Sequence, residues 1–319
     1  DVYKRQGTSI AQESPLWMRH CALSPDGTTI AFTYKGDIYT VPSTGGRATQ
    51  ITTNPAFDTE PVWSPDSKQI AFASDRMGSL DVFVVSSEGG APQRLTTHSG
   101  SEKPVAYKDN KHILFTANIA PSAEDAGFPS GQFQQVYEVA VTGGRPAMFS
   151  SMPMECISIN KEGVMLYQDK KGYEDPWRKH HQSSITRDIW LCTLGPERSF
   201  QKITSFKGED RNPVWAADGS SFYYLSEEKG SFNIFKNDLT GKSSRQITNH
   251  TTHPVRFLTS DSNGNLCYGY DGEIYTVKEG AQPKKVDVRI ISDKVENDLI
   301  HQLKTSGATD IAISPNGKE

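Results

Sequence analysis

The chain lacks the signatures that mark the common classes of enzyme, membrane protein and nucleic-acid-binding protein. It contains no GxSxG, HExxH, P-loop or GxGxxG motif. No stretch approaches the roughly 20 apolar residues that a membrane-spanning helix needs, so no membrane span is expected. Its 34 Lys and Arg residues against 38 Asp and Glu residues give a net charge of -4 and no basic field. Nucleic acid is therefore not an expected partner.

Metal and cofactor signals are also missing. The four cysteines, Cys21, Cys156, Cys192 and Cys267, form no CxxC pair and have no histidine at zinc-site spacing. We interpret them as small buried hydrophobic residues, and they do not identify the cellular compartment. The adjacent side chains of His180 and His181 would point in opposite directions on an extended segment. The sequence therefore predicts no metal site and no cofactor.

What the chain does contain is a repeated unit of roughly 40 to 55 residues, a period typical of propellers. Its clearest copy runs from Glu60 to His98. A Ser-Pro-Asp-Ser turn at 64–67 joins two predicted strands, because Pro fixes φ and Asp and Ser bond to local amides. The third predicted strand, at 81–85, is almost continuously apolar, which indicates that both of its faces are covered. The fourth, at 93–97, alternates with polar residues, as an outer edge strand does.

Three motifs recur in a fixed order along the chain. The turns are Ser24-Pro25-Asp26-Gly27, Ser64-Pro65-Asp66-Ser67, Lys108-Asp109-Asn110, Lys161-Glu162-Gly163, Ala217-Asp218-Gly219 and Asp261-Ser262-Asn263-Gly264. The third strands contain Asp37-Ile38-Tyr39, Asp81-Val82-Phe83, Gln135-Val136-Tyr137, Asp188-Ile189-Trp190, Asn233-Ile234-Phe235 and Glu273-Ile274-Tyr275. The fourth strands contain Gln50-Ile51-Thr52, Arg94-Leu95-Thr96, Lys202-Ile203-Thr204 and Gln246-Ile247-Thr248, with weaker versions at 147–149 and 285–286.

Six such units predict an all-β fold, a six-bladed β-propeller of four-stranded antiparallel blades spanning 18–290. Residues 1–17 are interpreted as a non-native leader followed by a signal-peptide remnant, because Ser9 and Ala11 form a small-x-small pattern. An exported, periplasmic or secreted bacterial protein is expected; without a processing signal the alternative is cytoplasmic. Residues 291–308 are expected to be a linker. Residues 309–319 repeat a first strand and turn, and so begin either a seventh blade or a second propeller.

Long loops and connectors are expected to gather on one face of this propeller. Insertions at 118–134 and 170–187 both lie between second and third strands, which open on the same side as the blade-to-blade connectors. The candidate peptide or domain contacts are Trp177, Arg178, Lys179, His180, His181 and Arg187 in or beside the second insertion, and Asp58, Glu60, Asp210, Arg211 and His253 in connectors. A Trp among cations is typical of an interface anchor or of a grip on carboxylates. The alternatives are that Trp177 pins its loop to its own blade, and that the connectors are ordinary turn formers.

The SPDG-type turns, the D-[IV]-[YF] strands and the Q-[IL]-T strands resemble the PD40 repeats of tricorn-like and TolB-like propellers. The segments EDPWRKHH and SSITRDIW resemble more narrowly the bacterial tricorn-type peptidases of the S41 serine peptidase class. This resemblance implies a non-catalytic propeller that guides or docks peptides or unfolded polypeptide in proteolysis. It also implies a downstream propeller, PDZ and peptidase domains in the same chain, with a homo-oligomer among the assemblies it allows.

No catalytic residue can be transferred from that resemblance, because this chain contains none of the family's catalytic domain. Two alternatives stay open at this point. One is a stand-alone TolB-like protein-binding propeller of the cell envelope. The other is the propeller of a prolyl-oligopeptidase or dipeptidyl-peptidase relative. Fold alone does not choose between them.

Overall fold

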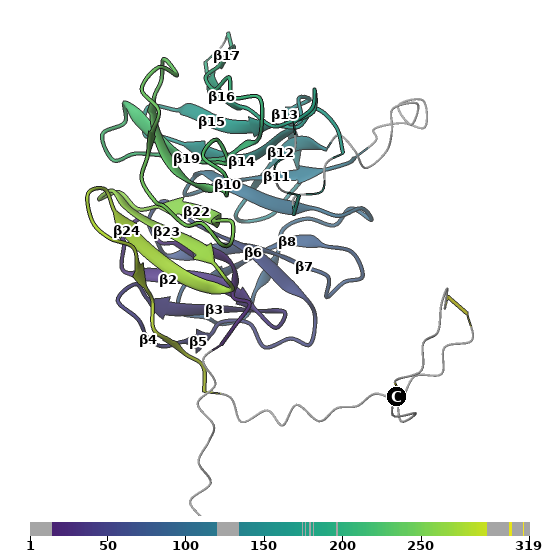
Figure 1. Cartoon of the computed structure of the whole chain (residues 1–319). Helices are drawn as coiled ribbons and strands as arrows, with labels where there is room; N and C mark the ends of the chain where they lie inside the picture. Colours follow the sequence, from purple (N-terminus) through teal and green to yellow (C-terminus); the bar gives the residue numbers. More distant parts are fainter. Residues whose placement is uncertain are drawn as a thin grey trace, which may run out of the picture.

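The computed structural model describes residues 15–119, 134–173, 175, 177–178, 180, 182–195, 197–291, 306–307 and 315. Within these residues all regular structure is β-strand, and no helix is long and apolar enough to cross a membrane. The strands form six four-stranded antiparallel sheets that follow one another in chain order (Figure 1). The predicted six-bladed propeller is therefore confirmed.

Each blade takes its strands consecutively, from the innermost to the outermost. Blade one contains β1 (Arg19–Leu23), β2 (Thr29–Tyr34), β3 (Asp37–Pro42) and β5 (Thr49–Gln50), and blade two contains β6 (Asp58–Trp63), β7 (Gln69–Ser74), β8 (Asp81–Ser86) and β9 (Gln93–Arg94). Blade three contains β10 (Lys103–Asp109), β11 (His112–Ala117), β12 (Gln135–Ala140) and β13 (Ala147–Ser150), and blade four contains β14 (Met154–Ile159), β15 (Val164–Asp169), β16 (Ile189–Thr193) and β17 (Ser199–Lys202). Blade five contains β18 (Asp210–Trp215), β19 (Ser221–Ser226), β20 (Asn233–Asp238) and β21 (Arg245–Gln246), and blade six contains β22 (Arg256–Ser260), β23 (Asn265–Tyr270), β24 (Glu273–Lys278) and β25 (Lys284–Lys285).

The repeated turn motif works through its Ser and Asp side chains. In blade two, Ser64 Oγ donates to Asp66 Oδ1 at 2.6 Å and accepts from the Gln69 amide at 2.9 Å. The Lys68 amide also donates to Asp66 at 3.2 Å. The hydrogen bond from Ser64, with that from Lys68, holds the pKa of Asp66 below its usual value. These bonds fix the hairpin that joins the first two strands of the blade.

The Thr of the fourth-strand motif ties the outer edge of a blade to its third strand. In blade one, Thr52 Oγ1 accepts from the Ile38 amide at 2.9 Å and donates to Asp37 at 3.4 Å. The same hydroxyl-to-amide bond recurs in the other blades that carry Q-[IL]-T or its variants, from Val82 to Thr96 at 2.9 Å, from Ile189 to Thr204 at 3.0 Å and from Ile234 to Thr248 at 2.9 Å. In blades one and five the Thr hydroxyl also bonds to the acid or amide that opens the third strand, Asp37 and Asn233.

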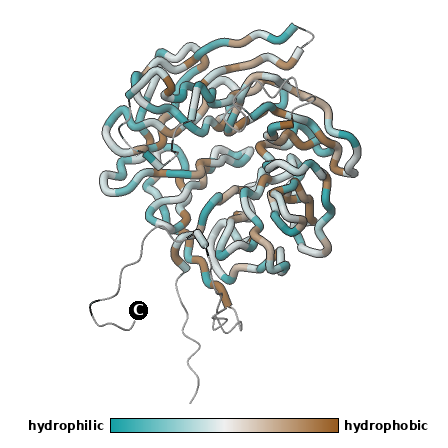
Figure 2. The backbone as a smooth tube through the Cα atoms, turned by 90° about the vertical axis from the view of Figure 1, so that its right-hand side faces the viewer, coloured by the Kyte–Doolittle hydropathy of each residue, from teal (hydrophilic) through white to brown (hydrophobic). Residues whose placement is uncertain are grey.

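The hydrophobic core lies between neighbouring blades. Second and third strands are buried on both faces, as Phe32, Ile38, Ile70 and Val82 show with no exposed surface. Figure 2 shows apolar stretches of the backbone alternating with hydrophilic ones along the chain. A blade alone could not bury these strands, so the core exists only where each sheet is covered by the next.

Blade six closes the ring against blade one. After blade six, β26 (Val288–Arg289) pairs in parallel with β4 (Gly46–Arg47), and the Ala48 amide donates to the Arg289 carbonyl at 2.9 Å. Val286 and Val288 are buried in the same cluster as Ile30, Phe32 and Cys267. Figure 1 shows the yellow-green strands of blade six beside the purple strands of blade one. The ring therefore closes by packing and a short parallel pairing, without a blade built from both ends of the chain.

A β-bulge interrupts the first strand of every blade. Each of these strands pairs irregularly with the second strand of its own blade and contacts the first strands of both neighbouring blades. In five blades the bulge contains a non-glycine residue in the left-handed region, namely His20, Glu60, Cys156, Asn212 and Phe257 with φ of 49° to 57°. Blade three has Pro104 at this register position, whose ring holds φ near −65°. The conformation costs on the order of 1–3 kcal/mol per residue, so blade packing must hold it.

The bulges correct one sequence-based interpretation. Asp58, Glu60, Asp210 and Arg211 were expected in connectors, but they belong to β6 and β18. The following residues Pro61 and Pro213 suggested that these segments lay outside the sheet. Both prolines fall within a bulge, where no regular ladder hydrogen bond is required, and so they are tolerated inside a strand.

Several predicted segments lie outside the described residues. They are residues 1–14 of the leader, positions 120–133 of the first insertion, and nearly all of the linker and the final first-strand motif at 309–319. The choice between a seventh blade and a second propeller therefore stays a prediction. The four cysteines are all free, as the sequence suggested. Cys21, Cys192 and Cys267 are buried, and Cys156 is half-buried.

Asn212 is expected to be the most sensitive of the left-handed residues. Its side chain donates to the Leu258 carbonyl at 2.8 Å and accepts from the Leu258 amide at 3.0 Å, which joins blade five to blade six. Asn212→Ala should lower the free energy of unfolding by about 2–4 kcal/mol, because both Leu258 groups lose their partner. Asn212→Gly should cost about 1 kcal/mol less, because Gly adopts positive φ without strain.

Chemical denaturation of the two variants measures this difference. The matched control is Asn263→Ala, an exposed turn residue whose replacement should change stability by less than about 0.5 kcal/mol. Equal stability of the Ala and Gly variants would show that backbone strain at Asn212 is negligible.

Candidate functional site

Six register-equivalent residues surround the axis of the propeller at the end where the first strands begin. Each lies just before the bulge of its strand and pairs with the fifth residue of the second strand. We call these residues the axial ring: Arg19, Thr59, Lys103, Glu155, Arg211 and Arg256. Four of them are cationic and one is acidic. The axial ring therefore offers positive charge from four different blades to a partner at this end of the axis.

Neighbouring carboxylates pair with part of this charge. Lys103 Nζ lies 2.7 Å from Glu60 of the adjacent blade. Glu155 lies 3.0 Å from Lys170 and 3.3 Å from Arg187, and both cations lower its pKa against the opposing effect of burial. Arg211 lies 2.8 Å from Glu209. Three of the four cations of the axial ring, Arg19, Arg211 and Arg256, lie together on the blade-five, blade-six and blade-one side.

The second insertion reaches across the axis to this cationic side. The Trp177 ring centroid lies 4.4 Å from the guanidinium carbon of Arg256 and 5.2 Å from that of Arg19. The turn that presents it is held by Asp175, whose Oδ1 accepts from the Trp177 amide at 2.8 Å and whose carbonyl accepts from the Arg178 amide at 3.1 Å. The second insertion of blade four thus contacts blades one and six through Trp177. The alternative that Trp177 pins the loop to its own blade is wrong.

Further along the insertion, His180 lies against blade five. The His180 amide donates to Glu227 Oε2 at 2.6 Å, while the imidazole is mostly exposed. The Arg178 side chain is also exposed. Lys179 and His181, which were predicted with them as contacts, lie outside the described residues. Of the cationic cluster in this loop, the structure thus places Arg178 and His180 at the surface.

Three candidate contacts lie inside the molecule. Asp58 has no exposed surface and accepts two hydrogen bonds from Arg76 at 2.9 Å each. Arg187 is buried between Glu155 and Glu209. Asp210 is buried, and burial raises its pKa to about 7. These positions give the three side chains a structural environment between blades, away from the surface where a peptide would bind.

The remaining candidates are partly accessible. Glu60 and Arg211 lie at the axis, where Arg211 also packs its guanidinium 5.1 Å from the Phe232 ring. His253 lies further out in the connector to blade six and is 3.3 Å from Asp271. The structure therefore brings Trp177, Glu60 and Arg211 to the axial end and separates His253 from them.

The axial end is suited to binding rather than to nucleophilic catalysis. Burial raises the pKa of the Cys156 thiol to about 12, so it carries no thiolate at neutral pH. The Thr59 hydroxyl contacts His20 Nδ1 at 3.1 Å but is itself buried. Burial also lowers the pKa of His20, which keeps it neutral. Guanidinium and indole groups can instead hold carboxylates and aromatic rings.

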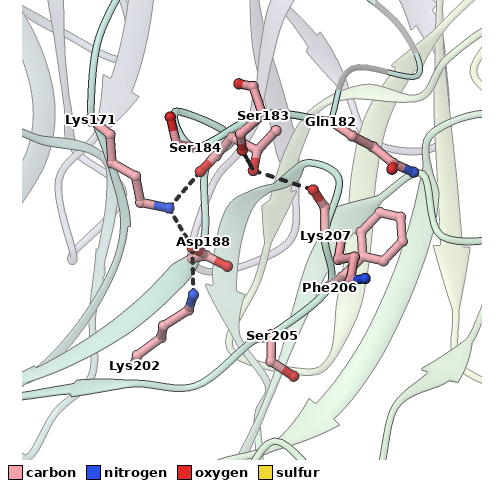
Figure 3. A pocket seen from close by; sticks show the side chains of 10 residues that line it. Lys171, Gln182, Ser183, Ser184, Asp188, Lys202, Ser205, Phe206 and Lys207 are labelled. Carbon is pink, nitrogen blue, oxygen red and sulfur yellow. Dashed lines mark hydrogen bonds and ion pairs between the residues drawn. The ribbon is translucent and has the colours of Figure 1, made fainter.

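A pocket of about 440 Å³ lies at the base of the second insertion (Figure 3). Lys171 and Lys202 both pair with the Asp188 carboxylate, and Lys171 Nζ also donates to the Thr186 carbonyl at 2.5 Å. The Thr186 hydroxyl lies 3.4 Å from the Lys207 carbonyl. The charges that line this pocket are thus used to fasten the base of the loop to blade four.

Sequence reasoning missed most of the axial ring. Arg19, Lys103, Glu155 and Arg256 were not predicted, although each precedes a bulge at the same register position. A signal was present, because aligning the six repeats on their turns places charged residues in one column just inside each first strand. The contacts of Arg19 and Arg256 with Trp177 carry no such signal, since they join segments that are far apart in the sequence.

The fold and the axial ring define a six-bladed propeller with a charged axial end. The family described as the tricorn protease N-terminal beta propeller domain matches residues 15–283, and the chain belongs to this family. It is 24% identical over 276 residues to tricorn protease homolog 1 of Streptomyces coelicolor, which covers 85% of this chain and 25% of that protein.

Two solved structures share the fold. The crystal structure of the tricorn protease superposes with a TM-score of 0.73 at 19% identity, over 88% of this chain and 27% of that one. TolB from Acinetobacter baumannii superposes with a TM-score of 0.53 at 16% identity, over 85% of this chain and 57% of that one. This chain spans about a quarter of the length of the tricorn proteins that it matches.

Stability should depend on pH through Glu102 at the joint between blades two and three. Burial, together with repulsion from Asp81, raises the pKa of Glu102 to about 7. Because an unfolded Glu titrates near pH 4.3, folding favours the protonated form. The contribution of Glu102 to stability is therefore full below about pH 4.3 and is lost as pH rises to about 7, on the order of 1–3 kcal/mol.

Glu102→Gln should remove this dependence, because a neutral amide can still donate to Asp81. Thermal unfolding at pH 5 and pH 8 should show a smaller decrease in Tm for the variant than for the wild type, by a few degrees. Glu88→Gln, at an exposed turn, is the control and should follow the wild type. An unchanged pH dependence in the Gln variant would contradict a protonated Glu102.

Proposed function

We propose that this propeller is the non-catalytic, peptide-guiding and docking module of a tricorn-like serine peptidase of the S41 class. Membership of the tricorn N-terminal propeller family supports the assignment to such a peptidase. The observation that carries the binding role is the axial ring, in which four of six register-equivalent side chains are cationic. A peptide carries carboxylates and a polar backbone, and cations at the end of the axis attract and orient it.

The position of the charge also fits a guiding role. Residues on the first strands lie nearest to the axis, and they are held by bulges whose geometry depends on the neighbouring blades. Glu155 and Arg187 extend the same network into the joint between blades four and five. A segment that approached along the axis would therefore meet a fixed set of charges rather than mobile surface lysines, which limits the entropy cost of contact.

The proposal extends to the other domains of the whole protein, to its location and to its self-assembly. Further propeller, PDZ and peptidase domains would act on the peptides that this module receives, and the whole protein would work in the periplasm or outside the cell. Self-assembly of the peptidase would bring several such propellers together. This wider context is inferred from the family and not from contacts within this chain.

Peptide binding by the chain tests the role. Fluorescence anisotropy with labelled peptides of roughly ten residues should show acidic peptides binding more tightly than neutral ones, with an affinity that falls as salt rises. Arg19→Glu should weaken binding of the acidic peptide roughly three- to tenfold, because it reverses one axial charge.

Lys284→Glu supplies the matched control, since it makes the same charge change on the exposed outer strand of blade six and should leave the affinity unchanged. Mass spectrometry of the same mixtures should recover intact peptides. Binding that is unaffected by Arg19→Glu would exclude the axial ring as the binding site. Cleavage by the purified chain would contradict a non-catalytic role.

A further inference from the structure

Trp177 makes an unusual pair of contacts for a loop residue. Two guanidinium groups from different blades, those of Arg19 and Arg256, approach one indole ring at 5.2 Å and 4.4 Å. Both distances lie within the range in which a cation is attracted to an aromatic face. The indole nevertheless keeps 49% of its surface exposed. It therefore occupies the cationic side of the axial ring without being packed into a core.

The loop does not need this contact to keep its place. Its base is fixed by the ion pair of Lys171 with Asp188 and by the bonds of Thr186, and its far side by the His180 amide on Glu227. These contacts involve blades four and five only. The reach of Trp177 to blades one and six is thus an addition to a loop that is already anchored.

The segment that carries Trp177 has the chemistry of a short peptide ligand. Asp175 lies two residues before Trp177, and its negative charge acts on Arg256. Burial, with repulsion from Arg211 and Arg19, lowers the pKa of Arg256 to about 10, and Asp175 opposes this shift. An acid and an aromatic ring are therefore presented together to the same arginine cluster.

We propose that Arg19 and Arg256 form a subsite for an aromatic side chain of a bound peptide, and that Trp177 occupies this subsite as an internal competitor. The preferred ligand is an extended peptide with an aromatic residue shortly after an acidic one. This inference rests on the proposed peptide-binding function and specifies the substrate class of the same site.

Competition of this kind is set by weak contacts from an anchored loop. Trp177 is carried by a loop that is already anchored on both sides of it, so it loses little entropy on contact and even exposed cation–π contacts keep it bound. A peptide with its own aromatic residue gains the same two contacts only after Trp177 leaves. A peptide without one gains nothing from displacing it.

Direct binding measurements on the full chain separate these cases. Two labelled peptides of equal length and charge are used, one containing Asp-Ala-Trp and the other Asp-Ala-Leu. Trp177→Ala should bind the Trp peptide roughly five- to thirtyfold more tightly than the wild type does, the range that two exposed cation–π contacts supply. The Leu peptide should bind equally to both proteins.

Two further variants assign the effect. Tyr173→Ala removes another exposed aromatic ring of the same loop and should leave both affinities unchanged. Arg19→Gln combined with Trp177→Ala should lose most of the gain for the Trp peptide. Circular dichroism of each variant verifies that the propeller is folded.

The outcomes distinguish this inference from the proposed function. If the Leu peptide binds but Trp177→Ala gives no selective gain for the Trp peptide, the aromatic subsite is refuted while peptide binding stands. An equal gain for both peptides would show that the loop only blocks access, and would also overturn the subsite. If neither peptide binds any of the proteins at millimolar concentration, both proposals fail.

Discussion

The contact between one blade and the next is the interaction on which this structure depends. The second and third strands carry most of the buried apolar side chains, and only a neighbouring sheet can cover them. A closed ring gives every blade two neighbours. Along the chain, the last of these contacts is the joint between blades six and one. Here Val286 and Val288 pack into the cluster of Ile30 and Cys267, while β26 pairs with β4. The same closeness of first strands places six register-equivalent side chains around one axis, so the axial ring is a direct result of how the core is buried.

Local chemistry made much of the fold predictable from the sequence. Two kinds of contact join residues that are near in sequence: the turn bond of Ser64 with Asp66, and the bond between Thr52 and Ile38. Because such contacts recur from blade to blade, the residues that make them form a visible repeat. Residue patterns could not predict the bulges, because the left-handed conformation at His20, Cys156 and Phe257 is imposed by neighbouring blades rather than by residue type. For the same reason Asp58 and Asp210 were expected in connectors, where Pro61 and Pro213 pointed, and not in strands.

The site shows a similar division. The second insertion was recognisable because it interrupts the repeat and contains a Trp among cations. The partners of its Trp were not recognisable, since Arg19 and Arg256 come close to it only when blades one and six lie side by side opposite blade four. Arg187 illustrates the opposite error: its place at the end of the insertion that contains Trp177 suggested a surface role, but Glu155 and Glu209 enclose it between blades. The sequence therefore identifies unusual side chains such as Trp177, but only the closed ring shows which side chains contact one another.

The closure without a shared strand also has a mechanical consequence. The first strand of the propeller begins at Arg19 and its last pairing ends at Arg289, and both belong to the joint between blades six and one. Tension applied between these two points would load that joint before any other, because the chain spans it only through the short pairing of β26 with β4. The ring would therefore open first at the joint between blades six and one. The other five joints would initially carry little of the force.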